Sequence, residues 1–139
     1  KHDKIMATYS VKGGRSMHES GENYLETILV LEQKNGSVRS IDIANELEYT
    51  KPSISRAMGI LRKDGFITME NSGRILLTPS GREKANKIYE RHLLLTRFLV
   101  LTLSVDEETA AKDACRIEHV ISAESFAKVK EFVEKEDRK

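Results

Sequence analysis

The fold is predicted mainly from the stretch TKPSISRAMGILRKDGFITMENSGRILLTPSG, residues 50–81. Apolar residues recur at helical spacing after Thr50, whose hydroxyl can cap a helix. Pro52 lies in the first turn, where its missing N–H costs no hydrogen bond. The apolar stripe consists of Ile54, Ala57, Met58 and Leu61. Two short alternating runs follow, joined by a polar break that contains Gly73, and they predict a β-hairpin.

Two further helices are predicted before this stretch. Apolar residues from position 22 onward indicate an amphipathic helix that ends near Gly36, and Ser40 can cap a short helix over residues 41–47. A helix, a short helix, a tight break, a third helix and a hairpin form the order of a winged helix-turn-helix. Residues 1–17 lack periodicity and contain two adjacent glycines, which is typical of a flexible extension or a cloning remnant.

The rest of the chain is predicted to be helical. Thr78 and Pro79 suit the cap and first position of a long helix over about residues 80–101, and shorter helices follow over about residues 106–121 and around residues 126–133. The long helix has more apolar side chains than one small domain requires, namely Ile88, Tyr89, Leu95, Phe98 and Leu99. We therefore expect a two-fold dimer interface, with packing inside the chain as the alternative for some of them.

The predicted fold class is mainly α with a small β-hairpin wing. A winged helix-turn-helix domain is expected over residues 18–79 and a helical dimerisation domain over residues 80–139. No apolar run approaches the roughly 20 residues that span a bilayer, so no membrane partner is expected. One cysteine excludes an internal disulfide and, with no secretory signal, indicates a reducing cytoplasm.

Charge is distributed unevenly over the 139 residues, although the formal net charge is only +1. Residues 51–82 sum to +4, with six basic residues against Asp64 and Glu70, whereas residues 20–50 sum to −4 and residues 106–139 to −3. A local basic surplus is what a small DNA-binding domain needs, because phosphates are neutralised locally. A solvated polar face with a chance imbalance is the alternative.

The third helix would lie in the major groove of DNA if the winged helix-turn-helix prediction holds. Off its apolar stripe are Ser53, Ser55, Arg56 and Gly59. The hydroxyls can contact phosphates or base edges, and Arg56 can pair with guanine through two hydrogen bonds or contact a phosphate instead. Further candidates for phosphate contacts are Arg39, Ser40 and Arg74.

The stretch DACRIEHVIS, residues 113–122, contains the single cysteine. On a helix, Cys115, Glu118 and His119 project from one stripe, and thiolate, carboxylate and imidazole are all ligands of first-row metals. His92 on the long helix and Asn23 or Glu26 on the first helix are candidates for further ligands. A buried structural cysteine and a Cys–His nucleophile pair are the alternatives, but no Gly-rich oxyanion loop accompanies the latter.

Six motifs together resemble the diphtheria toxin repressor and manganese transport regulator family of metal-dependent transcriptional repressors. They are ESGENYLETI, SIDIANEL, TKPSISRAMGILRKDGFI, LTPSGREKA, YERHLLL and DACRIEHVIS, in order over roughly residues 18–130. The resemblance implies a homodimer whose operator binding is permitted by metal held across its first, fourth and fifth helices. It implies metal ligands at Asn23, Glu26, His92, Cys115, Glu118 and His119, and operator contacts at Thr50, Pro52, Ser53, Ser55 and Arg56.

The chain departs from both family types. Asn23 replaces the Met of iron-type members and the Asp of manganese-type members; Glu26 and His92 follow the manganese type and Cys115 the iron type. Thr96 and Ala111 occupy two ancillary ligand positions, and the chain stops before the additional C-terminal domain of iron-type members. A two-domain repressor with a hybrid site is therefore expected.

The expected cofactor is Fe²⁺ or Mn²⁺ in the cell, with Co²⁺, Ni²⁺ or Zn²⁺ as substitutes in vitro. The resemblance implies metal-homeostasis genes as targets and no catalytic residues. The second hypothesis is a winged-helix regulator gated by oxidation of Cys115 or by a ligand that is not a metal. An enzyme that uses Cys115 and a histidine comes last.

Overall fold

The computed structural model describes residues 17–139, so the flexible extension predicted for the N-terminus lies almost entirely outside the described residues. The chain divides into two units, one that ends at Lys87 and one that spans Ile88–Lys139. Each is described by itself. None of the described helices is long and apolar enough to cross a membrane.

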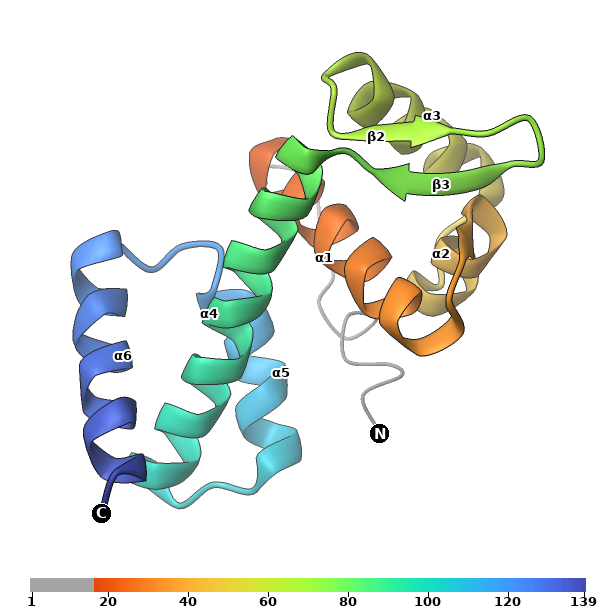
Figure 1. The fold of residues 1–139 in the computed structure, drawn as a ribbon. Coiled ribbons are helices and arrows are strands. Elements are labelled where there is room, and N and C mark those ends of the chain that lie inside the picture. Colours follow the sequence, from red (N-terminus) through yellow and green to blue (C-terminus); the bar gives the residue numbers. More distant parts are fainter. Residues whose placement is uncertain (1–16) are drawn as a thin grey trace. The chain divides into compact units, whose positions relative to one another are not determined.

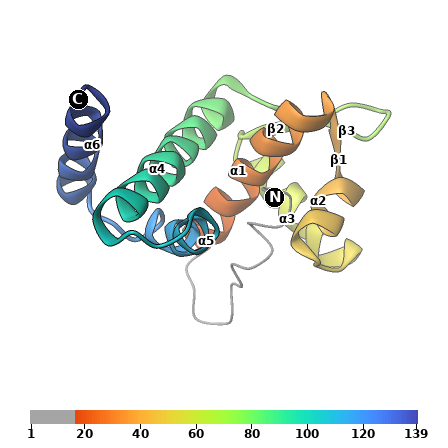
Figure 2. The ribbon, with the colours of Figure 1, turned by 90° about the horizontal axis from the view of Figure 1, so that it is seen from below.

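The first unit is a winged helix-turn-helix, as predicted. Its elements are α1 (Met17–Asn35), β1 (Val38–Arg39), α2 (Ser40–Leu47), α3 (Lys51–Lys63), β2 (Ile67–Met69), β3 (Arg74–Leu77) and the beginning of α4 (Pro79–Leu103). The predicted hairpin is formed by β2 and β3 (Figure 1). Strand β1 adds a third antiparallel strand, in the order β1-β3-β2, and lies beside α1 (Figure 2). It has two residues, too few to produce a periodic pattern.

The starts of the first two helices differ from the prediction. Helix α1 begins at Met17 rather than at residue 22. Arg39, not Ser40, is the N-cap of α2, because the Asp42 carboxylate accepts a hydrogen bond from the Arg39 backbone N–H at 2.9 Å. Ser40 is therefore the first helical residue. The capping side chain is therefore Asp42, the third residue of the helix, and not the Ser40 hydroxyl that the sequence predicts.

Helix α3 forms as its sequence predicts. The Thr50 hydroxyl oxygen accepts a hydrogen bond from the Ser53 N–H at 3.3 Å, and Pro52 lies in the first turn. Ile54, Met58 and Leu61 are buried in the core of the unit. The helix ends before Gly65, which has a φ of +85° that a residue with a side chain rarely adopts.

Hydrogen bonds fasten the end of α3 to the start of α4. The Thr78 N–H donates to the Phe66 carbonyl at 3.0 Å, and the Thr78 hydroxyl donates to the Gly65 carbonyl at 2.7 Å while it caps α4 through the Gly81 N–H. Gly81 is required here, since a Cβ would lie 2.0 Å from the Phe66 carbonyl oxygen. The segment that follows α3 and the first turn of α4 are thus held together by hydrogen bonds from the backbone and the side chain of Thr78.

A bidentate ion pair joins α1 to α4 within the first unit. The Arg82 guanidinium donates to both carboxylate oxygens of Glu32, at 2.9 and 3.0 Å. These hydrogen bonds lower the pKa of Glu32 below its usual value of 4.5. Because Arg82 is 43% exposed, solvent screens the pair and limits its contribution to about 1 kcal/mol or less.

We predict that Glu32→Gln lowers the free energy of unfolding at neutral pH and not in acid. A carboxyl whose pKa is lowered by folding stabilises the protein fully above its unfolded pKa, and this contribution is lost as pH falls through the folded pKa. Denaturant unfolding at pH 7 and in steps below pH 4.5 measures the difference. Glu131→Gln on the exposed side of α6 is the matched control, and a pH-independent difference for Glu32→Gln would contradict the prediction.

The second unit consists of the rest of α4 with α5 (Glu107–Ile117) and α6 (Ala123–Asp137). Its core is formed by Leu95, Ala114, Val129 and Val133. Figure 1 shows α6 running alongside α4 in the same direction. The rings of Phe98 and Phe132 meet edge to face with their centroids 5.5 Å apart, and Lys130 Nζ forms an ion pair with Glu90 Oε2 at 2.8 Å.

The structure of the second unit differs from the sequence prediction in two respects. Helix α5 ends at Ile117 rather than near residue 121, because Ser122 caps α6 and turns the chain into the next helix. Several side chains expected at a dimer interface pack inside the chain instead: Ile88 and Leu95 are buried, and Phe98 contacts the core of the unit. The large apolar side chains that stay exposed in this unit include Leu93, Leu103 and Val120.

Candidate functional site

Four side chains with metal-binding donor atoms meet in the second unit. His92 comes from the middle of α4, Cys115 from the last turn of α5, Glu118 from the C-cap of α5 and His119 from the turn that follows. We call these four residues the donor cluster. His119 is outside the helix, so the predicted single helical stripe is wrong in detail: Glu118 contacts His119, whereas Cys115 contacts His92.

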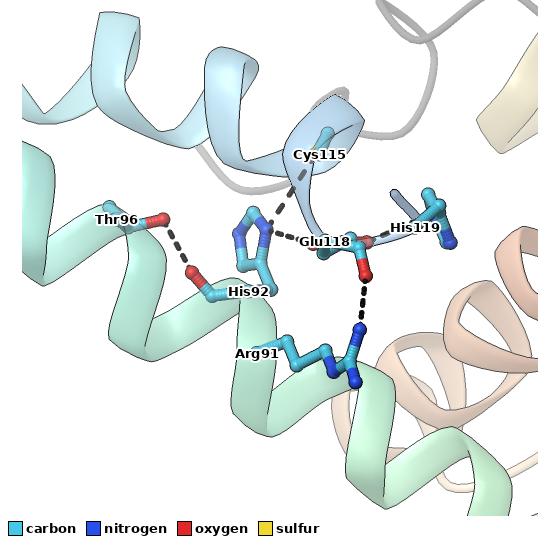
Figure 3. A network of polar contacts seen from close by, with 6 residues as sticks. All are labelled: Arg91, His92, Thr96, Cys115, Glu118 and His119. Atoms are coloured by element: carbon cyan, nitrogen blue, oxygen red, sulfur yellow. Dashed lines mark hydrogen bonds and ion pairs between the residues drawn. The ribbon is translucent and has the colours of Figure 1, made fainter. Parts of the chain in front are cut away.

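The Glu118 carboxylate lies between the two imidazoles. Its Oε1 is 3.1 Å from His92 Nδ1, and its Oε2 is 3.2 Å from His119 Nε2. Cys115 Sγ is 3.7 Å from the same His92 nitrogen. Figure 3 shows His92 and Cys115 on one side of Glu118 and His119 on the other.

The donor cluster is buried. The side chains of Glu118 and His119 are 0% exposed, that of His92 is 6% exposed, and Cys115 is fully buried. Burial of ionisable groups is costly unless they are paired or coordinate a metal. One thiol, one carboxylate and two imidazoles form a mixed S, O, N donor set that suits first-row transition metals, so the residues present fit such an ion.

Arg91 fixes the backbone that carries Glu118. Its Nη1 donates to the carbonyl oxygens of Glu118 and Ile121, both at 3.2 Å, and its guanidinium lies over the Phe126 ring at 5.3 Å. These bonds satisfy one carbonyl at the C-cap of α5 and one in the turn that leads to α6. Sequence reasoning missed Arg91 because nothing local distinguishes it from a solvated arginine on a helix.

The two ancillary positions offer no ligand. The Thr96 hydroxyl donates to the His92 carbonyl at 2.7 Å, so it is engaged by its own helix. Ala111 is a buried apolar residue of α5.

The remaining two candidate ligands lie in the first unit. Asn23 and Glu26 are on α1, at a spacing that puts them on one face, and both side chains are buried. The Asn23 carbonyl oxygen Oδ1 has no hydrogen-bond partner among the described residues. An amide oxygen in this state is available to a cation.

The candidate DNA contacts all lie in the first unit. On α3, Pro52, Ser53, Ser55 and Arg56 are exposed, while the Thr50 hydroxyl caps the helix and donates to the Ser53 hydroxyl at 2.8 Å. Arg39 and Arg74 are exposed and directly opposite each other on β1 and β3, and Ser40 follows at the start of α2. Like charges at paired positions of a sheet repel, and a phosphate between them would relieve that repulsion.

The fold and the donor cluster together describe a winged-helix protein with a candidate metal site. Two family models cover nearly all of the chain: the N-terminal DNA-binding domain of iron-dependent repressors matches residues 16–74, and their metal-binding and dimerisation domain matches residues 78–139. The chain belongs to the iron-dependent repressor family, whose members are metal-responsive DNA-binding regulators of transcription.

Similar proteins of known name are transcriptional regulators. The chain is 34% identical over 120 residues to an HTH-type transcriptional regulator of Methanocaldococcus jannaschii, covering 86% of this chain and 96% of that protein. It is 33% identical over 115 residues to the regulator MntR of Lysinibacillus sphaericus, covering 83% and 82%. It is 30% identical over 110 residues to the diphtheria toxin repressor of Corynebacterium diphtheriae, covering 79% of this chain and 49% of the repressor.

Solved structures share the fold. A manganese-dependent transcriptional repressor in complex with manganese superposes with a TM-score of 0.76 at 24% identity, over 81% of this chain and 52% of that one. The structure of IdeR from T. acidophilum superposes with a TM-score of 0.74 at 24% identity, and the match covers 88% of this chain and 54% of that one. The chain therefore spans about half the length of these solved proteins.

Proposed function

We propose that the protein represses transcription by binding operator DNA when a divalent transition metal ion occupies the donor cluster. The observation that carries this proposal is the buried chain of side-chain contacts that runs from Cys115 through His92 and Glu118 to His119. The ion would supply the positive charge that this buried donor set lacks. Glu118 would orient both imidazoles, and Arg91 would hold the backbone of Glu118 in place.

Asn23 and Glu26 are proposed to complete the ligand set from α1. Their match to the first-helix positions of the family and the unsatisfied amide oxygen of Asn23 support this role. Ligands in both units would let metal occupancy bias the DNA-binding unit. That is the physical requirement for an ion that acts as a co-repressor.

We propose Fe²⁺ as the cellular signal and Mn²⁺ as the runner-up. A thiolate favours softer or borderline ions, whereas the oxygens of Asn23, Glu26 and Glu118 suit Mn²⁺ or Fe²⁺. Zn²⁺ should bind more tightly than either in vitro by the general affinity order, so its affinity does not identify the signal. The thiolate must also stay reduced, which suits the cytoplasm.

The DNA partner is proposed to meet α3 and the wing. Ser53, Ser55 and Arg56 would face the major groove, next to Thr50 and Pro52 at the start of the helix. Arg39 and Arg74 would hold a backbone phosphate between them, with Ser40 beside it. The protein would act as a homodimer through its second unit, where Leu93, Leu103 and Val120 leave apolar area exposed.

Oxidation of Cys115 is the weaker hypothesis for gating. Redox-sensing cysteines are solvent-accessible, because an oxidant has to reach the sulfur. Cys115 is buried beside His92, which favours a ligand role over a sensor role. The same burial keeps a substrate away from the thiol and weighs against an enzyme.

Titration with Co²⁺ under anaerobic, reducing conditions tests the proposal. We expect one equivalent of Co²⁺ per chain to produce a thiolate-to-cobalt charge-transfer absorption, and Cys115→Ser to abolish that band while oxygen and nitrogen ligands still hold the ion. Thr96→Ala is the matched control, because Thr96 hydrogen-bonds to the backbone of His92 and provides no ligand. A wild-type protein that binds no Co²⁺, or binds it without the band, would contradict the proposed site.

A further inference from the structure

Gly59 lies in the exposed side of α3, where the fold gives no reason for a glycine. Glycine is the poorest helix former after proline. Among the described glycines, those with a positive φ are Gly36, Gly65 and Gly73, so Gly59 is not one of them. A Cβ at Gly59 would have no atom of the described chain within 4 Å, in contrast to Gly81, whose Cβ would clash with the Phe66 carbonyl. Folding therefore does not require a glycine at this position.

Its place on the helix is the centre of the candidate DNA-binding face. With 3.6 residues per turn, Pro52, Arg56, Gly59 and Lys63 form one row, and all four are exposed. The row lies opposite the buried stripe of Ile54, Met58 and Leu61. Helix α3 contains four basic residues and no acidic residue, which matches a polyanionic partner: Lys51, Arg56, Arg62 and Lys63.

The size of the major groove explains what a missing side chain achieves there. A helix with its side chains is about 10–12 Å across, and the major groove of B-DNA is about 12 Å wide and 8.5 Å deep. The side chain at the centre of the inserted face thus limits how deeply the helix can enter. Glycine is the residue used where a backbone approaches a ligand closely.

We infer that Gly59 is the point of α3 that comes closest to the base edges of the major groove when the protein binds double-stranded DNA. This inference rests on the proposed function and names a determinant of its specificity. The absent side chain lets the helix sit deeper, and that depth brings Arg56, one turn earlier, within reach of a guanine edge. A Cβ at position 59 would push the helix outward and weaken base contacts more than phosphate contacts.

The experiment begins with a selection of preferred sequences from a random duplex pool by the metal-loaded wild-type protein. Failure to enrich any sequence would refute the proposed function and leave Gly59 irrelevant. If a sequence is enriched, the affinities of wild type, Gly59→Ala and Gly59→Leu are compared on that duplex and on an unrelated duplex of the same length. Gly21→Ala on α1 is the matched glycine control, because its Cβ would make an ordinary contact with Leu61. Arg56→Ala is the positive control for base readout.

For Gly59→Ala, we expect a rise in Tm of about 2–4 °C, because alanine favours the helix, together with at least a tenfold loss of affinity for the selected duplex. The loss on the unrelated duplex should be much smaller, and Gly59→Leu should lose more than Gly59→Ala. Gly21→Ala should gain stability without losing affinity, whereas Arg56→Ala should lose affinity for the selected duplex.

Three results would overturn the inference. Unchanged affinity of Gly59→Ala for the selected duplex would mean that DNA does not approach this position. An equal loss on both duplexes would place it against phosphates rather than base edges. A fall in Tm would mean that the glycine serves the fold.

Discussion

Replacing Glu118 by glutamine is expected to lower the affinity for divalent metal by more than about 100-fold. The carboxylate contacts both imidazoles of the donor cluster, at 3.1 and 3.2 Å. Loss of a supporting contact to a metal ligand typically costs 10–100-fold in affinity, and loss of a charged ligand should cost at least as much. Glutamine keeps the shape of the side chain, so the core around it should remain packed.

Competition of the purified protein with a chelator of known affinity measures this change. Glu90→Gln is the matched control, since it removes a carboxylate of α4 that is paired with Lys130 outside the donor cluster. Thermal unfolding without metal should show that both variants are folded. If Glu118→Gln bound metal as tightly as Glu90→Gln does, the donor cluster would not be the metal site.

The DNA-binding unit was largely predictable because its signals are local. The Thr50 cap, Pro52 in the first turn and the apolar spacing that follows are chemical features of consecutive residues, and they define α3. The polar break at residues 71–73 likewise defines the hairpin. Strand β1 escaped prediction because its pairing partners in β3 are distant in sequence: Arg39 pairs with Arg74 and Val38 with Ile75 only in the folded chain.

The second unit was less predictable because its details depend on packing. No glycine or proline marks the end of α5, so the helix predicted from apolar periodicity extends beyond Ile117, where the actual helix ends. Ile88 and Leu95 have the same apolar character whether they face a partner or the chain's own core, and sequence could not separate the two.

In the candidate metal site too, local features could be predicted from the sequence and features that depend on packing could not. The spacing of Cys115, Glu118 and His119 was visible in one short motif, although the helix ends among them. His92 could be nominated as a neighbour, but its distance of 3.1 Å from Glu118 depends on how α4 packs against α5. Arg91 could not be identified, because its role is to bind carbonyls that lie 27 and 30 residues further along the chain.

Metal should control the affinity for DNA by a factor of roughly 5–150, which corresponds to a coupling of about 1–3 kcal/mol. Such coupling requires that the ion bind the DNA-competent arrangement more tightly than any other. Ligands proposed in both units, His92, Cys115, Glu118 and His119 in one and Asn23 and Glu26 in the other, provide a physical basis for that preference. Thermodynamic linkage demands the reciprocal effect, so the selected duplex should raise metal affinity by the same factor.

The most direct test of this account is the affinity of the reduced protein for its selected duplex, measured by fluorescence anisotropy at fixed ionic strength, in excess chelator and in saturating Fe²⁺, Co²⁺ or Mn²⁺. We expect tighter binding with metal by roughly 5–150-fold, half-maximal at lower Fe²⁺ or Co²⁺ than Mn²⁺, and no metal response in Glu118→Gln. Equal affinity of the wild-type protein in chelator and in every metal would contradict the account.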